Sequence, residues 1–298
     1  MGPSLAHMAA RATHGKRRVI AVSRWSSDAA EKKLNGAGVE TIRADLLDRE
    51  SVARLPDAPN VIYMAGQKFG TTGAPAMTWA MNTIVPMYCA ERYRDSRIVA
   101  FSTGNVYPLT PVASRGAKED DPLGPVCEYA ASCVGRERVF EFYSERYGTK
   151  FSIIRLNYAI DLRYGVLVDI ATHVKHQDAL PIDMGYVNVI WQGDANHIAL
   201  EALSHASSPP YVLNVTGDEH LAVREIAEWF GRRFGTKPVL TGTERRDALL
   251  SDTSRMRSSF SAPEVSAEQM YEWVADWLDS GGPLLGKPTH FEARDGKF

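Results

Sequence analysis

The chain has 298 residues, a length that fits about two domains of ordinary size. Hydrophobic residues make up 44% of it and charged residues 23%, which is typical of a globular protein with a large core and excludes a disordered chain. The net charge of -2 argues against a basic nucleic-acid surface or a polybasic membrane patch, and three cysteines cannot build a disulfide framework. We therefore expect a cytoplasmic protein without nucleic-acid or membrane partners, and no metal site.

Two segments imitate membrane or targeting signals. Residues 69–90 contain no charge, but their glycines, prolines and asparagine favour a loop and a buried helix over a membrane span. Residues 1–27 have no acid and several basic residues, as a transit peptide does. The same residues also fit a helix and a strand of the fold, and we favour that interpretation.

The first half of the chain alternates between strand and helix patterns. The predicted strands are mostly apolar, as parallel strands buried on both faces should be, and segments of helical length and spacing separate them. This alternation predicts an α/β fold with a doubly wound, Rossmann-like parallel sheet. In chain order we expect a helix at 4–12, strand 18–23, helix 28–34, strands 39–45 and 60–66, helix 77–93, strand 97–104, helix 128–147 and strand 151–157.

After residue 157 the pattern becomes a smaller mixed α+β lobe, in which we expect substrate recognition. The predicted division is 1–160 and 161–298, with the strand at 211–217 returning to the main sheet. The expected elements are helix 163–177, short strands 180–183 and 187–191, helix 194–205, strand 211–217 and helices 223–234 and 266–278.

Ligands of a doubly wound sheet bind at the carboxyl ends of its strands. The first predicted strand ends with Ser23 and Arg24, a hydroxyl and a guanidinium that suit a ribose 2′-phosphate better than the free hydroxyl of NAD. A solvated arginine is an equally good interpretation. Asp45 and Leu46 end the next strand, where they could face an adenine amino group, although a strand-end acid is also common.

Small and hydroxyl-bearing residues follow the next two strands. Ala65 and Gly66 would allow close approach of a dinucleotide. Thr103 ends the fourth strand, and Tyr129 begins a helix further along the chain. A hydroxyl and a phenol at the ligand edge of a sheet can hold and protonate a carbonyl oxygen.

Tyr129 needs a neighbouring cation to work near neutral pH, because the ordinary pKa of a phenol is near 10. The natural position for it, four residues later on the same helix face, is Cys133. Arg136 shares that face but lies about 10 Å along the axis, which makes it a poor substitute. We expect Cys133 to be a buried structural thiol rather than a nucleophile, and Tyr129 to keep a pKa near its ordinary value.

Taken in order, these residues resemble an extended short-chain dehydrogenase/reductase of the NAD-dependent epimerase/dehydratase family, which acts largely on nucleotide sugars. The similarity spans most of residues 18–160, and the second half matches in layout rather than in motif. The shared pieces are Ser23 with Arg24, Asp45 with Leu46, Ala65 with Gly66, Asn82, the Ser-Thr-x-x-Val-Tyr run at 102–107, Tyr129, and Arg155-Leu156-Asn157.

The resemblance implies an NAD(P)-dependent oxidoreductase, epimerase or dehydratase acting on a sugar nucleotide or a similar polar carbonyl or alcohol compound. Residues 1–160 would bind the dinucleotide and 161–298 the substrate, and a homodimer is compatible with the family. Thr103 would hold the reacting oxygen and Tyr129 would exchange its proton. Ser23 and Arg24 favour NADP. The cofactor-binding residues would be Gly2, Ser23, Arg24, Asp45, Leu46, Ala65, Gly66, Asn82, Tyr129, Cys133 and Asn157.

Two features depart from the family pattern. Only Gly2 can be the last glycine of the pyrophosphate loop, and since the strand that should precede it is central in the sheet, we expect the reading frame to extend upstream. The lysine of the family's Tyr-x-x-x-Lys motif is Cys133, although that lysine binds the nicotinamide ribose and lowers the pKa of the tyrosine. A second hypothesis therefore stays open, in which the protein binds a dinucleotide but has lost turnover and acts as a sensor or partner subunit.

Overall fold

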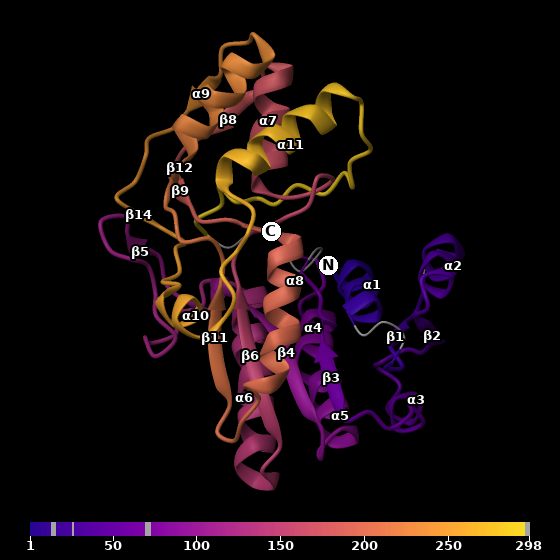
Figure 1. The fold of residues 1–298 in the computed structure, drawn as a ribbon. Coiled ribbons are helices and arrows are strands. Elements are labelled where there is room, and N and C mark those ends of the chain that lie inside the picture. The colour runs from indigo at the N-terminus through magenta and orange to yellow at the C-terminus, as the bar shows by residue number, and fades with distance from the viewer. Residues whose placement is uncertain (13–15, 26, 69–72, 296–298) are drawn as a thin grey trace.

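A four-stranded parallel sheet, in the order β11-β6-β4-β3, forms the base of the molecule (Figure 1). The computed structural model describes residues 1–12, 16–25, 27–68 and 73–295. Every residue of β4 after its first is buried, which explains the nearly continuous apolar sequence of this strand. The Rossmann-like α/β fold predicted from the sequence is confirmed. The strands are β3 (Asn60–Tyr63), β4 (Arg97–Thr103), β6 (Lys150–Leu156) and β11 (Tyr211–Val215).

The outer strand β11 comes from the second half of the chain. It pairs in parallel with β6, with Leu213 opposite Ile154, and both residues are fully buried. Helices α8 (Gln192–Glu201) and α10 (Ser254–Ser259) contribute to the same hydrophobic cluster. The second half of the chain therefore helps to build the sheet as well as its own lobe.

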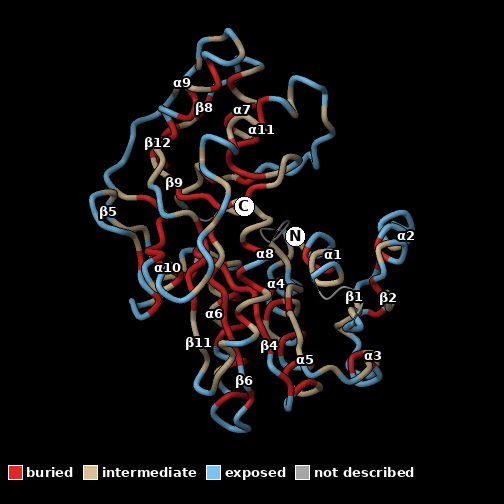
Figure 2. The backbone as a smooth tube through the Cα atoms, viewed as in Figure 1, coloured by how far each residue is buried: buried red, intermediate tan, exposed pale blue. Residues whose placement is uncertain are grey.

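Strands β1 (Ile20–Ser23) and β2 (Glu40–Arg43) form a separate two-stranded parallel sheet. Within the described ranges, no strand pairs with the second edge of β1 or of β3. Figure 2 shows few buried residues in β1 and β2, in contrast to β4 and β6. Helices α1 (Gly2–Ala12) and α2 (Asp28–Gly36) pack on this pair, and α3 (Arg49–Ala53) follows it.

The predicted helix 77–93 is three consecutive helical pieces: α4 (Pro75–Trp79), a π-helical turn (Ala80–Ile84) and α5 (Val85–Arg92). Pro86 has no N–H to donate to the carbonyl of Asn82, and the helix widens at that point. The first four residues of the uncharged segment 69–90 lie outside the described residues. Among the helices that the structure describes, none combines the length and apolar composition needed to cross a bilayer.

Helix α6 (Glu128–Tyr147) occupies the residues predicted for it, because both of its ends are encoded locally. The thiol of Cys127 accepts a hydrogen bond from the N–H of Ala130 at its start. Gly148 ends it in the left-handed conformation, with φ of 70°. Helix α6 packs beside α4 and α5 and against β4, which brings its first turns to the carboxyl end of the sheet.

The second lobe, at the top of Figure 1, has its own core between three helices, α7 (Val166–His176), α9 (Val223–Phe234) and α11 (Ala267–Asp279). The C-terminal segment returns to this lobe, where Phe291 is buried in the core. Short strand pairs connect the parts of the lobe. They are β7 (Ala159–Ile160) with β10 (Ile190–Trp191), β8 (Ala179–Pro181) with β13 (Val239–Thr241), β9 (Tyr186–Val187) with β12 (Leu221–Ala222), and β5 (Thr110–Pro111) with β14 (Asp247–Ala248).

Candidate active site

Tyr129, in the first turn of α6, meets the end of β4. The hydroxyl of Thr103, the last residue of β4, accepts a hydrogen bond from the N–H of Asn105 at 3.2 Å and hydrogen bonds to the Tyr129 hydroxyl. The Tyr129 hydroxyl also hydrogen bonds to the thiol of Cys133, one turn later on the same helix. The fold therefore brings the hydroxyl and the phenol together at the carboxyl end of the sheet, where a reacting oxygen could be held.

Burial has the largest effect on the pKa of Tyr129. It raises the pKa of Tyr129 far above the ordinary value, and Cys133 acts in the same direction, while the charge of Arg136 and the hydroxyl of Thr103 lower it. The prediction that Tyr129 keeps a near-ordinary pKa is wrong, because the surrounding protein removes water from the phenol. Burial likewise raises the pKa of the fully buried Cys133 thiol. At neutral pH Cys133 is a protonated, structural thiol.

Arg136 reaches the same end of the sheet. Its Nη1 donates to the carbonyl of Phe101 in β4 at 2.8 Å, and its Nη2 donates to Oδ1 of Asn82 at 2.5 Å. A Cβ on Gly66 would lie 2.4 Å from Nη2, so the guanidinium rests directly against the chain after β3. The place of Arg136 further along α6 does not keep its side chain from this end of the sheet, because helical side chains point toward the N-terminus of their helix.

Asn82, on the π-helical turn, fastens the loop after β3 to α6. Its Oδ1 accepts from the N–H of Gln67 at 3.0 Å, and its Nδ2 donates to the carbonyl of Gln67 at 3.1 Å and to Oγ of Ser132 at 2.9 Å. Asn82 is completely buried. Asn82 therefore connects the loop after β3, which contains Gly66 and Gln67, to Ser132 on α6. In this way it positions the loop.

Lys68 and Asp169 also approach this site, although no sequence pattern indicated it. The Nζ of Lys68 lies 3.4 Å from the hydroxyl of Tyr164, in the second lobe. Burial lowers the pKa of Lys68, whereas the nearby Asp169 and Cys133 raise it. Asp169 accepts hydrogen bonds from the N–H and hydroxyl of Thr289, at 2.7 and 2.6 Å. These partners are far apart in sequence, so only the fold brings them together.

The residues predicted to bind the adenosine end lie on the separate two-stranded sheet. Ser23 ends β1, Arg24 follows it, and both are exposed; the Ser23 hydroxyl accepts a hydrogen bond from the N–H of Trp25. Asp45 accepts from the N–H of Leu47 at 3.0 Å, and Leu46 is half-buried after β2. None of these four touches Tyr129 or Thr103 among the contacts of the described residues.

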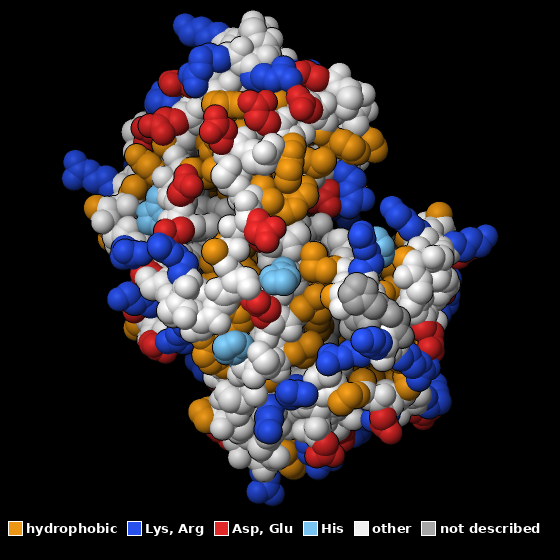
Figure 3. All heavy atoms as spheres, in the orientation of Figure 1, with side chains coloured by type: hydrophobic (Ala, Val, Ile, Leu, Met, Phe, Trp, Pro, Cys, Tyr) orange, Lys and Arg blue, Asp and Glu red, His pale blue; other side chains and the backbone are white. Residues whose placement is uncertain are grey.

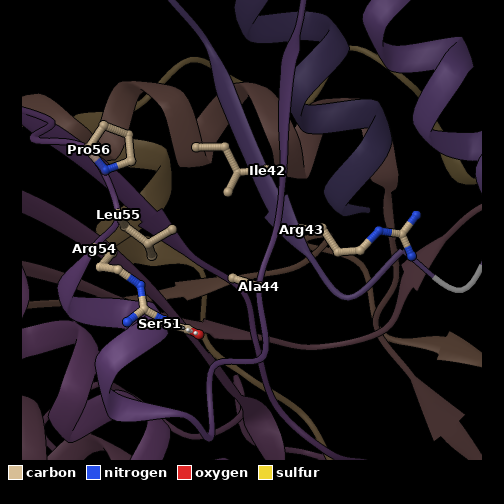
Figure 4. A pocket seen from close by; sticks show the side chains of 7 residues that line it. All are labelled: Ile42, Arg43, Ala44, Ser51, Arg54, Leu55 and Pro56. Carbon is tan, nitrogen blue, oxygen red and sulfur yellow. Dashed lines mark hydrogen bonds between the residues drawn. The ribbon is translucent and has the colours of Figure 1, made fainter.

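A cavity of about 220 Å³ lies between β2 and α3. In Figure 4, Ile42 points toward Leu55 and Pro56, while the guanidinium of Arg43 points to the opposite side. The walls contain neither Ser23 and Arg24 nor Asp45 and Leu46. Its lining residues are Ile42, Arg43, Ala44, Ser51, Arg54, Leu55 and Pro56.

Asn157, Gly2 and Ala65 are the remaining residues predicted to bind the cofactor. Asn157 is buried, and its Nδ2 donates to Oδ1 of Asn188 at 3.0 Å and to the carbonyl of Leu249 at 3.2 Å, so it links β6 to the second lobe. Gly2 begins α1, and a Cβ there would meet no atom within 4 Å. Ala65 is half-buried beside Gly66.

A buried ion pair beneath the site holds α6 to the sheet. Glu137 accepts from Nη2 of Arg155 at 2.7 Å, and their side chains are 0% and 5% exposed. Glu137 also accepts from the hydroxyl of Ser102 at 2.5 Å, and Arg155 donates to the hydroxyl of Tyr107 at 2.7 Å. The network fixes the helix that carries Tyr129 against the strand that carries Thr103.

The sequence and the structure were compared with those of known proteins. The model of the NAD dependent epimerase/dehydratase family matches residues 1–160. No curated protein matches the sequence. Among solved structures, the chain is similar to a UDP-glucuronic acid 4-epimerase from Bacillus cereus, with 16% identity, 94% of this chain and 96% of that chain covered, and a TM-score of 0.79.

Two other solved structures have the same fold. A UDP-glucose 4-epimerase from Thermus thermophilus, in complex with NAD, is 20% identical, with 92% of this chain and 95% of that chain covered and a TM-score of 0.74. A dTDP-glucose 4,6-dehydratase from Streptomyces venezuelae, with NAD bound, is 19% identical, with 93% and 94% covered and a TM-score of 0.76.

Proposed function

Because the chain belongs to the NAD-dependent epimerase/dehydratase family, we propose that it interconverts an alcohol and a carbonyl on a sugar nucleotide or a similar polar compound. Residues 1–160 bind the dinucleotide and 161–298 recognise the substrate. The observation that carries the proposal is the hydrogen bond between Thr103 and Tyr129 at the carboxyl end of β4. This pair supplies a holder for the reacting oxygen and a group that exchanges its proton.

The residues around the site fit an anionic dinucleotide. The first turn of α1 carries no acidic side chain, and Gly2 leaves its N-terminal end uncrowded. Buried Arg136 adds a positive charge without a carboxylate partner in the described part of the chain. When bound, the nicotinamide supplies the hydride chemistry. The residues that would hold the dinucleotide are Gly2, Ser23, Arg24, Asp45, Leu46, Ala65, Gly66, Asn82, Tyr129, Cys133 and Asn157.

In this mechanism Thr103 donates a hydrogen bond to the substrate oxygen and Tyr129 takes or returns its proton. Their bond to each other in the structure gives way to the substrate oxygen, which enters between them. Cys133 keeps the phenol oriented through its hydrogen bond. Asn82 holds the loop carrying Gly66 against α6, which fixes the wall of the site.

A preference for NADP follows from the surroundings of Arg24. Asp28 and Glu31 lie nearby in sequence, but both pair with Arg43, at 3.2 and 2.9 Å. Among the described residues Arg24 has no ion-pair partner, and its exposed side chain is available for a 2′-phosphate. Lys and Arg side chains gather on this part of the surface around α2 (Figure 3), which also favours the more negative cofactor.

A homodimer is supported by apolar side chains on the outer faces of α4, α5 and α6. Met77, Ile84 and Met87 follow helical spacing and are 46%, 41% and 38% exposed. Phe142 on the neighbouring α6 is 55% exposed. A second copy of the chain would cover this surface and remove it from water.

A second candidate function is a dinucleotide-binding sensor without turnover. It is favoured by the neutral thiol of Cys133 beside Tyr129 and by the burial that raises the pKa of this phenol. Incubation of the protein with UDP- and dTDP-linked sugars, NAD and NADP distinguishes the two functions. Because an epimerase causes no net change in cofactor, products are measured by chromatography and NMR as well as by absorbance. Turnover that is lost in Tyr129→Phe supports the enzyme, and cofactor binding without any product supports the sensor.

A further inference from the structure

A phenol shielded from water works as a base only where a positive charge favours its ionised form. Position 133 provides a neutral thiol, and the cation must come from elsewhere. The charged or titratable groups that face Tyr129 or Cys133 are Arg136 and Glu137 on α6 and Cys127 before it. Tyr63, at the end of β3, and Lys68, in the loop after β3, also face Cys133.

Of these groups, Arg136 is built into the site most tightly. The residue is 6% exposed, and two of its nitrogens donate hydrogen bonds to the carbonyl of Phe101 and to Oδ1 of Asn82. Asn82 in turn bonds to Ser132, the neighbour of Cys133. The Asn82 side chain therefore links the guanidinium to the turn of α6 that carries Cys133, and the charge of Arg136 acts on both the phenol and the thiol.

The charge of Arg136 is not neutralised in the described part of the chain. The next residue, Glu137, bonds to Arg155 and Ser102 instead. The Nε of Arg136 is buried and has no hydrogen-bond partner among the described residues. Burying a cation without a carboxylate partner is energetically costly, which indicates that the charge of Arg136 has a role at this position.

We propose that Arg136 supplies the positive charge that Tyr129 needs for proton exchange, in place of a lysine at position 133. Arg136 is a positioning residue, because it acts through the phenol and not on the substrate. Its charge lowers the pKa of both Tyr129 and Cys133, opposing the effect of burial. Lys68 is less suited to this role, because its ammonium lies at Tyr164 and near Asp169. The effect of Arg136 on turnover rests on the proposed function, whereas its effect on the pKa of Tyr129 does not.

The electrostatic part is tested without turnover. A fluorinated tyrosine in place of Tyr129 has a lower intrinsic pKa, which brings its titration into the pH range in which the fold survives. Its midpoint is read by fluorine NMR. Arg136→Gln removes the charge while keeping hydrogen-bonding atoms, and should raise the midpoint by about one pH unit or more. Arg136→Met, an apolar side chain of similar length, should do the same, while Arg136→Lys should stay near the native midpoint. Equal midpoints in the native chain and in a folded neutral variant would overturn the proposal.

The effect on turnover is tested by moving the positive charge from position 136 to position 133. Arg136→Gln should move the rising limb of the kcat pH profile to higher pH, and adding Cys133→Lys in that background should return it. In the native background Cys133→Lys should bring no gain, because two cations then crowd one buried site. A pH profile unchanged by Arg136→Gln, with faster turnover in the single Cys133→Lys variant, would contradict the proposal. If the native protein turns over no substrate, the proposed function fails, and the fluorine titration still decides the role of Arg136.

Discussion

The hydroxyl of Tyr129 hydrogen bonds to the thiol of Cys133, which lies four residues later on α6. The bond lowers the pKa of the thiol and raises that of the phenol. Since a thiol carries no charge at neutral pH when burial raises its pKa, Cys133 orients Tyr129 but does not promote its ionisation. The same burial makes the thiol unreactive.

Alkylation of the native protein should therefore discriminate between its cysteines. Burial raises the pKa of Cys89 to about 12 and also raises that of Cys133, whereas Cys127 is partly exposed. Because the thiolate is the reactive form, iodoacetamide at neutral pH should modify Cys127 first and the buried pair only after unfolding. A pH of about 9 is still below the raised pKa values of Cys89 and Cys133, so the order in which the cysteines are alkylated should not change at that pH. Mass spectrometry of tryptic peptides measures it, and native labelling of Cys133 as fast as Cys127 would contradict it.

Gly66→Ala should disturb the cluster around Arg136. The added Cβ would lie 2.4 Å from Nη2 of Arg136 and 2.9 Å from Oδ1 of Asn82, so the guanidinium must shift. We expect a loss of about 1–3 kcal/mol in the free energy of unfolding, measured by urea denaturation. Gly36→Ala is the control, because a Cβ there meets no atom within 4 Å. A smaller loss at position 66 than at position 36 would argue against a close contact.

Glu137→Gln should be strongly destabilising, because it leaves the buried Arg155 without its carboxylate. The expected loss is about 3–5 kcal/mol in the free energy of unfolding. Glu141→Gln, on the same helix, removes the partner of the exposed Arg138 and should cost about 0–1 kcal/mol. Urea denaturation of both variants measures the difference, and similar losses would mean that the Glu137–Arg155 pair contributes little.

Arg24→Ala should weaken the binding of NADP and leave that of NAD nearly unchanged, because only NADP carries the 2′-phosphate. A loss of about tenfold in affinity corresponds to one charged hydrogen bond of about 1.4 kcal/mol. Isothermal titration with both cofactors measures it. Arg97→Ala, in the exposed first position of β4, is a control for the loss of charge. Equal losses for both cofactors would assign Arg24 to the adenine or to the fold.

Ile84→Glu should prevent self-association, because it places a charge in the apolar surface formed by α4, α5 and α6. The expected result is a shift from dimer to monomer in analytical ultracentrifugation. Val239→Glu is the matched control, since Val239 is 44% exposed but lies on β13 of the second lobe. A native protein that is monomeric at all concentrations, or a dimer insensitive to Ile84→Glu, would exclude this interface.

The sequence predicted those elements whose signals are local. Helix α6 has the predicted bounds because its residues have helical length and spacing and Gly148, a residue type typical of helix ends, directly follows it. Strand β4 was recognisable as a nearly uninterrupted apolar run. The two-residue strands β5 and β14 were not predicted, because two paired residues on each strand are too few to show a periodicity. The predicted single helix at 77–93 contains a π-helical turn, which depends on the missing N–H of Pro86.

The sequence alone determined the family and the residue types at the strand ends, because the order and spacing of these motifs can be read directly from the chain. Which charges reach the phenol was decided by the tertiary structure. Arg136 seemed too distant when only its place along the helix axis was counted, but its side chain leans back to Phe101 and Asn82. Lys68 and Asp169 come from different lobes and meet only after folding. Electrostatic energy depends on the distance between charges and on their burial, and neither quantity can be read from the sequence.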